Sequence, residues 1–185
     1  MDLNKAIQNR HSVRKFKDKK PDWRNIIECI DVARYAPMAG NIYSVRFILI
    51  DDKKTIQELA DAAQQQFIST AHYVVVVCSE PRLTSNAYSE RGDMYLKQQA
   101  GAAIQNFLLK IEESGLSTTW VGAFVDEMVK KSLKIPENIE IEAIFPVGYE
   151  YEKKYTKKLK IDLDNILYFN QFKNKKMKPR EKLDV

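Results

Sequence analysis

Apolar positions recur along much of the chain with the spacing of an α-helix, in which residues three and four apart share one face. The longest such stretch, about residues 93–113, stops just before Gly115, a residue suited to the left-handed end of a helix. Asp2 and Asp22 stand where a carboxylate can cap the first turn of two further helices. Helices are therefore expected after Asp2, between Asp22 and Pro37, and over about residues 54–66, 93–113 and 126–133.

Four other stretches have the pattern of β-strands, whose side chains alternate between two faces. Val74–Val77 is a β-branched run, typical of a central strand covered on both faces. Along Ile139–Val147, Glu140 and Glu142 alternate with apolar residues, as in a strand with one wetter face. Strands are expected over residues 46–51, 72–79, 118–121 and 139–147. The polar segment 81–92 is expected to be a loop, with some helix as the alternative. These elements predict an α+β fold in which helices flank a central mixed or antiparallel sheet of undetermined strand order.

The end of the chain contains two contrasting segments. Ile161–Phe172 carries many apolar side chains and is expected to dock on another surface, because such a patch is seldom left in water. Lys173–Val185 is rich in charged residues and is expected to be a flexible tail. We therefore predict one domain over residues 1–172 and a charged tail over residues 173–185.

Composition limits the classes of protein and of site. Hydrophobic residues make up 44% of the chain, which is enough for a folded core. We find no apolar run of the roughly 18 residues that a membrane span needs, and no apolar core of a secretory signal, so a cytoplasmic protein is expected. Cys29 and Cys78 form no redox or zinc motif and are expected to be buried thiols. His11 and His72 stand apart from any metal-binding cluster.

The positive charge is concentrated near the end of the chain. Lys153–Val185 contains eleven Lys or Arg against four Asp or Glu, whereas Met1–Glu152 carries a net charge of −2. Such a basic segment could meet nucleic acid without sequence preference. Alternatively, a few of its lysines could neutralise a cofactor phosphate while the others are solvated.

Two short segments carry the candidate chemistry. Asn9–Phe16 places two arginines, a histidine and a serine within five positions, and guanidinium groups match phosphates and polarised carbonyl oxygens bidentately. Ala36–Asn41 is rich in small residues, which allow a flat ligand to approach the backbone closely.

Four blocks of the chain resemble one known family, in that family's order. Asn9–Phe16 resembles the R-(R/H)-S-(V/I)-R signature near the start of the nitroreductase family, and Ala36–Asn41 resembles its A-P-S-(A/S)-x-N turn. Gln99–Gly122 resembles the long helix and the strand after it, and Phe145–Tyr149 resembles the P-I-G-Y/F ending. On these blocks the chain is identified as a member of the nitroreductase family.

The resemblance implies a homodimer with an FMN at each of two interface sites, the long helix at the dimer contact and a swapped C-terminal extension. Arg10 and Ser12 would bind the phosphate and ribityl end together with two lysines, whereas Arg14 would face the N1/C2 carbonyl edge of the flavin. The turn would reach the flavin of the other subunit, and a backbone N–H near residue 122 would lie at N5. The full set of implied FMN contacts is Arg10, His11, Ser12, Arg14, Pro37, Met38, Ala39, Asn41, Val121, Gly122, Ala123, Lys158 and Lys160.

The chain departs from the family pattern at three places. Met38 replaces the usual serine, Tyr43–Val45 replaces the usual Gln-Pro-Trp, and Gln99 replaces a frequent aspartate and is given no role. These departures leave the substrate open. The segment 82–95 is expected to supply the lid, in which Tyr88 and Tyr95 either stack on a planar acceptor or simply pack in the protein.

No side chain is predicted to be a general acid, base or nucleophile, which fits a protein whose chemistry is performed by FMN. The expected activity is ping-pong electron transfer from NADH or NADPH to an electrophilic acceptor such as a nitroaromatic or a quinone. The alternatives are a flavin-fragmenting or dehalogenating relative, a flavin-binding protein without turnover, and a basic nucleic-acid-binding module.

Overall fold

A computed structural model describes residues 1–152 and 161–177. The chain divides into two compact units, Met1–Glu152 and Lys153–Val185, and each is considered by itself. Lys158 and Lys160, two of the expected phosphate ligands, lie outside the described residues. The division into a domain over residues 1–172 and a tail over residues 173–185 stays a prediction.

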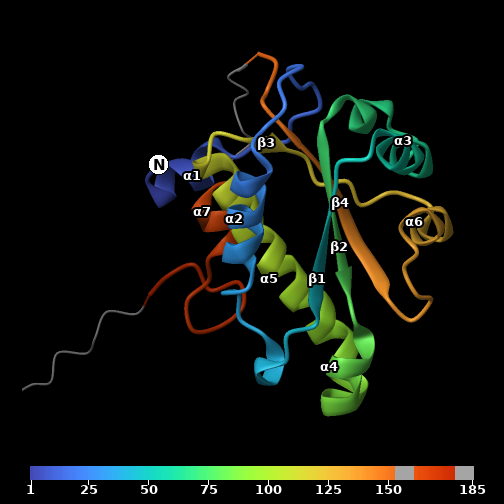
Figure 1. Cartoon of the computed structure of the whole chain (residues 1–185). Coiled ribbons are helices and arrows are strands. Elements are labelled where there is room, and N and C mark those ends of the chain that lie inside the picture. Colours follow the sequence, from blue (N-terminus) through green and yellow to red (C-terminus); the bar gives the residue numbers. More distant parts are fainter. Residues whose placement is uncertain (153–160, 178–185) are drawn as a thin grey trace, which may run out of the picture. The chain divides into compact units, whose positions relative to one another are not determined.

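The first unit is built on an antiparallel sheet, to which the described residues contribute four strands (Figure 1). The strands pair in the order β1–β2–β4–β3, and each neighbouring pair is antiparallel. All residues of β2 are buried. This confirms the strand covered on both faces that the β-branched run predicted. The strands are β1 (Val45–Ile50), β2 (Tyr73–Ser79), β3 (Ser117–Thr118) and β4 (Glu140–Gly148).

One face of the sheet is covered by α2 (Trp23–Ala33) and α5 (Gly92–Glu113), and α1 (Leu3–Asn9) lies against α5. Their inward side chains form a core with the strand residues that point to this side, among them Val75 and Phe145. This core brings the longest helix of the unit directly onto the centre of the sheet.

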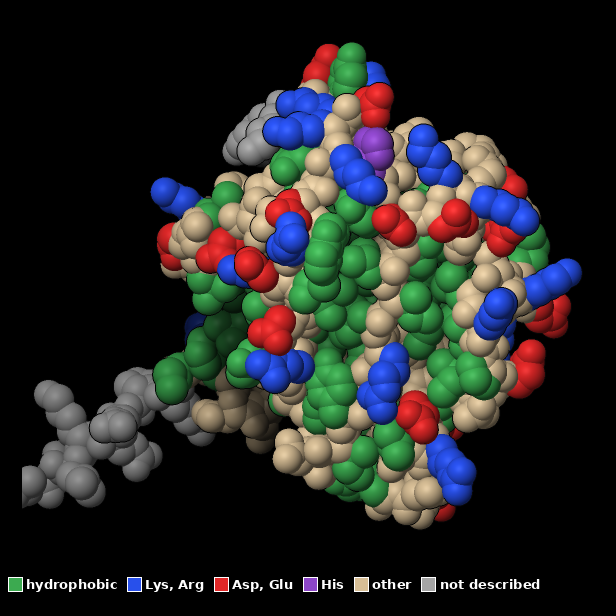
Figure 2. Space-filling model, in the orientation of Figure 1, with side chains coloured by type: hydrophobic (Ala, Val, Ile, Leu, Met, Phe, Trp, Pro, Cys, Tyr) green, Lys and Arg blue, Asp and Glu red, His purple; other side chains and the backbone are tan. Residues whose placement is uncertain are grey.

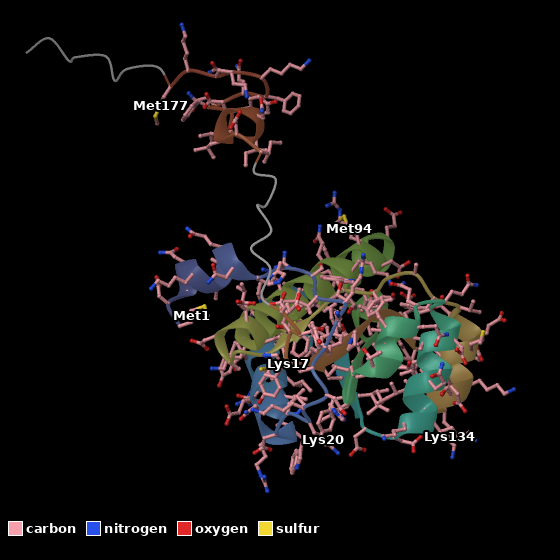
Figure 3. The ribbon with its side chains drawn as sticks, turned by 90° about the horizontal axis from the view of Figure 1, so that it is seen from above. Met1, Lys17, Lys20, Met94, Lys134 and Met177 are labelled. Carbon is pink, nitrogen blue, oxygen red and sulfur yellow. The ribbon has the colours of Figure 1, made fainter. Side chains whose placement is uncertain are left out.

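The opposite face is covered by α3 (Lys53–Ala62) and α6 (Asp126–Leu133), which pack against the alternate strand residues such as Val76. Figure 3 shows the two layers at opposite edges of the view, with Met1 beside α1 at one edge and Lys134, after α6, at the other. Helices on both sides of an antiparallel sheet confirm the predicted α+β fold.

The ends of the helices follow the local signals in the sequence. The Asp2 carboxylate accepts from the Asn4 N–H and the Asp22 carboxylate from the Arg24 N–H, which satisfies first-turn donors that have no partner within the helix. After α5, Gly115 has φ 72°, the left-handed conformation expected at a helix end.

Two helices are shorter than their apolar patterns predicted. The expected helix before Pro37 ends at Ala33, and a short 3₁₀ turn, η1 (Ala39–Asn41), follows Pro37. The helix expected up to residue 66 ends at Ala62 and is followed by η2 (Gln66–Thr70). Apolar spacing marks the inward face of such segments but continues through turns that also bury side chains.

Residues 81–92 were expected to form a loop with some helix as the alternative, and the structure has the helical alternative. This segment forms α4 (Pro81–Tyr88) and the 3₁₀ turn η3 (Ser89–Arg91). Proline is well tolerated in the first turn of a helix because its missing N–H would have no partner there. A Cβ on Gly92 would lie 2.7 Å from Ser85 Cα, so the absence of a side chain allows α4 and α5 to meet closely.

The strand expected over residues 118–121 was also shorter than predicted. Regular pairing is confined to Ser117–Thr118, and Val121 forms an isolated antiparallel bridge with Ile144.

In the second unit, the described residues contain a short helix, α7 (Leu163–Ile166). This helix lies within the apolar segment Ile161–Phe172, in which the Tyr168 and Phe172 rings pack edge to face at 4.9 Å. The large apolar side chains remain exposed, Ile161 at 63% and Phe172 at 79%. Within the described parts of the chain, we find no helix with the length and apolar character to cross a membrane.

Candidate functional site

The segment Asn9–Phe16, here called the N-terminal cluster, lies along the end of the sheet formed by β3 and β4. The Val13 N–H donates to the Thr118 carbonyl at 3.0 Å, and the Tyr151 N–H donates to the Lys15 carbonyl at 3.0 Å. Val13 and Phe16 point into the protein and are buried, so the residues between and beside them are turned outward. Ser12 and Arg14, on either side of Val13, are both exposed.

His11 is held by two acceptors. Its Nδ1 lies 2.9 Å from the Asn9 carbonyl oxygen and its Nε2 lies 2.9 Å from Glu150 Oε1. Burial lowers the pKa of His11, but the hydrogen bonds to Glu150 and Asn9 and the charges of Glu150 and Glu112 outweigh it, so the pKa is raised overall. A carbonyl and a carboxylate both accept, so the ring fits best as an imidazolium that donates from both nitrogens.

This pair predicts a specific pH dependence. Because the folded pKa of His11 is raised, its stabilising contribution is complete below the unfolded value of about 6.5 and is lost as pH rises through the folded pKa. Replacing Glu150 by glutamine should lower the thermal midpoint most at about pH 5.5, and this difference should shrink above the folded pKa.

The thermal midpoints of the wild type and of the Glu150→Gln variant are measured from about pH 5.5 to above the folded pKa of His11. An NMR titration of His11 accompanies them. His11→Asn supplies the assignment of its resonances. An equal loss of midpoint at acid and alkaline pH would show that Glu150 acts through packing and not through the charge of His11.

Around Pro37–Asn41 the chain makes a tight turn. Gly40 has φ 57° and Asn41 has φ 59°, both left-handed, and glycine and asparagine are the residues that tolerate this region best. Met38 and Ala39 are half-buried, whereas Pro37 and Asn41 are exposed.

The turn is fastened to α5 by a side chain to which the sequence assigned no role. Gln99 is 3% exposed, and its Oε1 accepts from the Ala39 N–H at 3.1 Å. A signal for it was present: Gln99 stands next to Ala100 on the apolar, inward stripe of α5, where an amide needs polar partners.

A cavity of about 460 Å³ opens beside this turn. The rings of Tyr88 and Tyr95 meet edge to face there, with centroids 5.1 Å apart. The lining side chains are apolar, aromatic or amide, and none of those named is charged. They belong to Pro37, Met38, Ala39, Tyr88, Tyr95, Gln98, Gln99 and Ala102.

The third group of expected FMN contacts follows β3. The Val121 N–H donates to the Ile144 carbonyl at 3.0 Å, so this donor already has a partner. Gly122 and Ala123 come next and are exposed. A backbone donor for a ligand at this edge would therefore come from Gly122 or Ala123 and not from Val121.

The structure brings the first and third groups together and keeps the turn apart from them. Val13 pairs with Thr118, close to Val121, whereas Ala39 is bound to Gln99 in the first half of α5. About 21 Å of helix separates Gln99 from the end of α5 at a rise of about 1.5 Å per residue. Figure 1 shows the η1 turn and the N-terminal segment at opposite ends of the unit.

The two cysteines are not part of this arrangement. Cys29 and Cys78 are both buried and free, as predicted. Burial raises the pKa of each thiol to about 11, so both thiols stay protonated and unreactive near neutral pH.

Comparison with known proteins places this architecture in a family. A model of the nitroreductase family matches residues 7–71 and 63–149. A protein of Archaeoglobus fulgidus, provisionally named NADH dehydrogenase/NAD(P)H nitroreductase, is 30% identical over 155 residues, which cover 81% of this chain and 86% of that protein. An iodotyrosine deiodinase of Thermotoga neapolitana is 26% identical over 168 residues, 82% of this chain and 90% of that enzyme.

The fold agrees with the sequence comparison. The crystal structure of a provisionally named NADH dehydrogenase/NAD(P)H nitroreductase from Parabacteroides distasonis has a TM-score of 0.81 and 28% identity, and the match covers 92% of this chain and 98% of that one. The family match spans the N-terminal cluster, the turn, α5 and β4, the same four blocks on which the resemblance was based. This chain therefore belongs to the nitroreductase family.

Proposed function

We propose that this protein is an FMN-dependent oxidoreductase that passes electrons from NADH or NADPH to an electrophilic organic acceptor such as a nitroaromatic or a quinone. The donor leaves before the acceptor binds. The observation that carries the proposal is the exposed pair Ser12 and Arg14 on a segment whose Val13 N–H is bonded to the Thr118 carbonyl, four residues before the exposed Gly122.

The donor groups of this cluster fit a flavin mononucleotide. The Arg10 guanidinium and the Ser12 hydroxyl match the charge and the acceptor oxygens of a phosphate monoester, whereas both ring nitrogens of His11 are already bound to Asn9 and Glu150. Bound FMN would supply the hydride and electron transfer. Arg10 and Ser12 would hold the phosphate end with the His11 ring in contact beside them, Arg14 would face the carbonyl edge, and Gly122 or Ala123 would donate at N5. Lys158 and Lys160 remain proposed phosphate ligands.

A second copy of the chain would complete the site. The turn with Met38 and Ala39 lies too far along α5 to reach the cluster of its own chain, so we propose that it contacts the flavin bound by the partner. Exposed apolar side chains on this unit, including Leu3, Trp23 and Ile27, are the kind of surface that a partner covers. Figure 2 shows hydrophobic side chains gathered over the middle of one face, with Lys and Arg side chains around them.

The cavity beside the turn would receive the acceptor. Its neutral, partly aromatic lining suits a flat, uncharged ring, and Met38 gives it an adaptable apolar wall. The similarity to an iodotyrosine deiodinase raises a second candidate, a halogenated phenol. A zwitterionic amino-acid acceptor needs charged partners, which the lining side chains lack, so a neutral nitroaromatic or quinone is favoured.

The direct test is the flavin content and its reduction. Purified protein should bind about one FMN per chain, released by heat and identified by chromatography, since the cluster offers a phosphate site without a loop for a pyrophosphate. In the absence of oxygen, NADH or NADPH should reduce the bound flavin and remove its yellow colour. Menadione should then reoxidise the flavin and restore the colour. Recovery of FAD, or refusal of added FMN by folded protein, would overturn the proposal.

Two rival functions give different results in the same experiments. A flavin-binding protein without turnover would hold FMN that neither nicotinamide reduces. A nucleic-acid-binding module would be colourless and would retard DNA or RNA with a steep dependence on salt.

Replacing Arg14 by alanine should make the bound flavin harder to reduce. A fixed cation near the carbonyl edge stabilises the negative charge of reduced flavin, so its loss should lower the midpoint potential, by about a few kcal/mol at most in free energy. The fold should survive because Arg14 is exposed. The contact that it loses is a cation–π contact, with the guanidinium 5.9 Å from the centroid of the Phe67 ring, and such contacts at exposed sites stabilise by only about 0.5–1 kcal/mol. Redox titration of the bound FMN is the measurement.

Arg24→Ala is the matched control, since Arg24 is an exposed arginine at the start of α2 whose partner is Asp22. It should leave the potential unchanged. If Arg14→Ala retained FMN with the potential of the unaltered protein, Arg14 would have no part in the redox site.

A further inference from the structure

The amide of Gln99 is buried at a point where three elements meet. Gln99 lies on the inward face of α5 and is 3% exposed. Ser44, just before β1, and Thr84 of α4 are fully buried beside it. Because a buried amide is costly without hydrogen bonds, its partners decide whether it stabilises this junction.

The partners determine which way the amide points. The Ala39 N–H can only donate, so the atom that faces it at 3.1 Å is the carbonyl oxygen Oε1. Nε2 then donates to Ser44 Oγ and to Thr84 Oγ1, the latter at 3.2 Å. Both N–H groups of the amide and one oxygen lone pair are therefore used.

The same junction fixes the wall of the cavity. Thr84 and Tyr88 are four residues apart on α4 and share one face. A Cβ on Gly40 would collide with the Tyr88 hydroxyl, so Tyr88 rests directly on the left-handed turn. Gln99 thus binds Ala39 on one side of the cavity and the helix that carries Tyr88 on the other.

We propose that Gln99 is a positioning residue that joins α4 to the Met38–Ala39 turn and so holds the acceptor cavity in its binding shape. This inference rests on the proposed function, in which the cavity receives the acceptor. It concerns the cavity and the turn and leaves the phosphate site intact, because the N-terminal cluster lies at the other end of α5. Altering Gln99 should weaken binding of a flat acceptor and spare the retention of FMN phosphate.

The chemistry of the junction gives a readout that a purely structural role would not move. The wild-type junction is neutral. A carboxyl in the Gln99→Glu variant would resist ionisation because burial raises the pKa of an acid. Acceptor binding to that variant should therefore vary with pH between about 5 and 8.5, where an ordinary glutamate of pKa about 4.3 is already ionised.

Several other ionisable groups lie around the junction. The phenols of Tyr88 and Tyr95 line the cavity. Lys97, two residues before Gln99 on α5, is paired with Glu140 and Glu142 of β4. Arg46 is paired with Glu80, just before α4. Since all are present in both proteins, a pH dependence confined to the variant reports the new carboxyl.

The experiment follows reoxidation of the flavin by menadione in a stopped-flow instrument. FMN-loaded protein is first reduced with dithionite, so nicotinamide binding does not enter the measurement. Gln99→Leu should raise the apparent Kd for menadione about tenfold, the effect of losing roughly 1.4 kcal/mol of hydrogen bonding. Thr84→Val, which keeps the shape and removes one acceptor, should raise it about threefold on the same scale.

Gln105→Leu is the control, because Gln105 is an exposed glutamine on the same helix. Its apparent Kd for menadione should match that of the wild type. Should Gln99→Leu not fold, Thr84→Val and the pH profile of Gln99→Glu decide the question. The inference is overturned if folded, FMN-loaded variants bind menadione as the wild type does at every pH. Failure of the wild type itself to hold FMN or to react with menadione would instead overturn the proposed function.

Discussion

Replacing Phe107 by alanine should lower the free energy of unfolding by about 3–5 kcal/mol, the usual cost of removing a large aromatic ring from a core. Phe107 is fully buried on α5. Its ring centroid lies 5.5 Å from that of Phe145 on β4 and 6.0 Å from that of Phe47 on β1. The substitution would leave a hole between the longest helix and two strands, which neighbouring side chains cannot fill without moving the sheet.

The measurement is chemical denaturation of the purified protein. Tyr35→Ala is a suitable control, since Tyr35 is 71% exposed after α2 and its removal should change stability by less than about 0.5 kcal/mol. A loss below about 1.5 kcal/mol for Phe107→Ala would mean that α5 relaxes onto the sheet and that the core is less rigid than its packing indicates.

Truncation after Tyr155 should abolish stable dimerisation and FMN retention together. The removed segment contains Lys158 and Lys160, the proposed phosphate ligands, and the exposed apolar residues that we expect to dock on the partner. Each large apolar side chain that becomes fully buried contributes about 1.5–3 kcal/mol. Analytical ultracentrifugation and the flavin absorbance of the truncated chain are the measurements.

A second truncation, after Phe172, separates the two parts of the C-terminal segment. It removes the charged residues 173–185 and keeps the apolar set and both lysines, so it should remain dimeric and yellow. If the shorter chain ending at Tyr155 were also dimeric and yellow, the phosphate site would lie wholly in the N-terminal cluster and the extension would not be exchanged between subunits.

Local signals in the sequence were sufficient for the elements that bury one clear face. The caps at Asp2 and Asp22, the left-handed Gly115 and the buried β-branched strand are all present in the structure. Helix caps and strand periodicity act over a few residues, so they can be found without knowledge of the fold. The family resemblance also came from short blocks, and the comparison with known proteins confirmed it.

Contacts between distant parts of the chain could not be predicted from the sequence. The polar segment 81–92 contains a helix that packs on α5, a contact that its own composition does not specify. His11 finds Glu150 across 139 positions, and Gln99 finds Ala39 across 60. Such hydrogen bonds depend on where the sheet and α5 place each segment, and that placement comes from the packing of the whole core.

In the candidate site, too, some features follow from local sequence and others from the packing of the whole chain. The sequence by itself determined which residue types could bind a phosphate or approach a flat ligand, because this chemistry belongs to the side chains at Arg10–Arg14 and to the small residues of the turn. Only the tertiary structure decided that these two segments stand at opposite ends of α5 and that Gln99 fastens the second one. The reason is physical: the composition of a segment specifies its functional groups, whereas the distance between segments is set by the rigid helix and the sheet on which both are mounted.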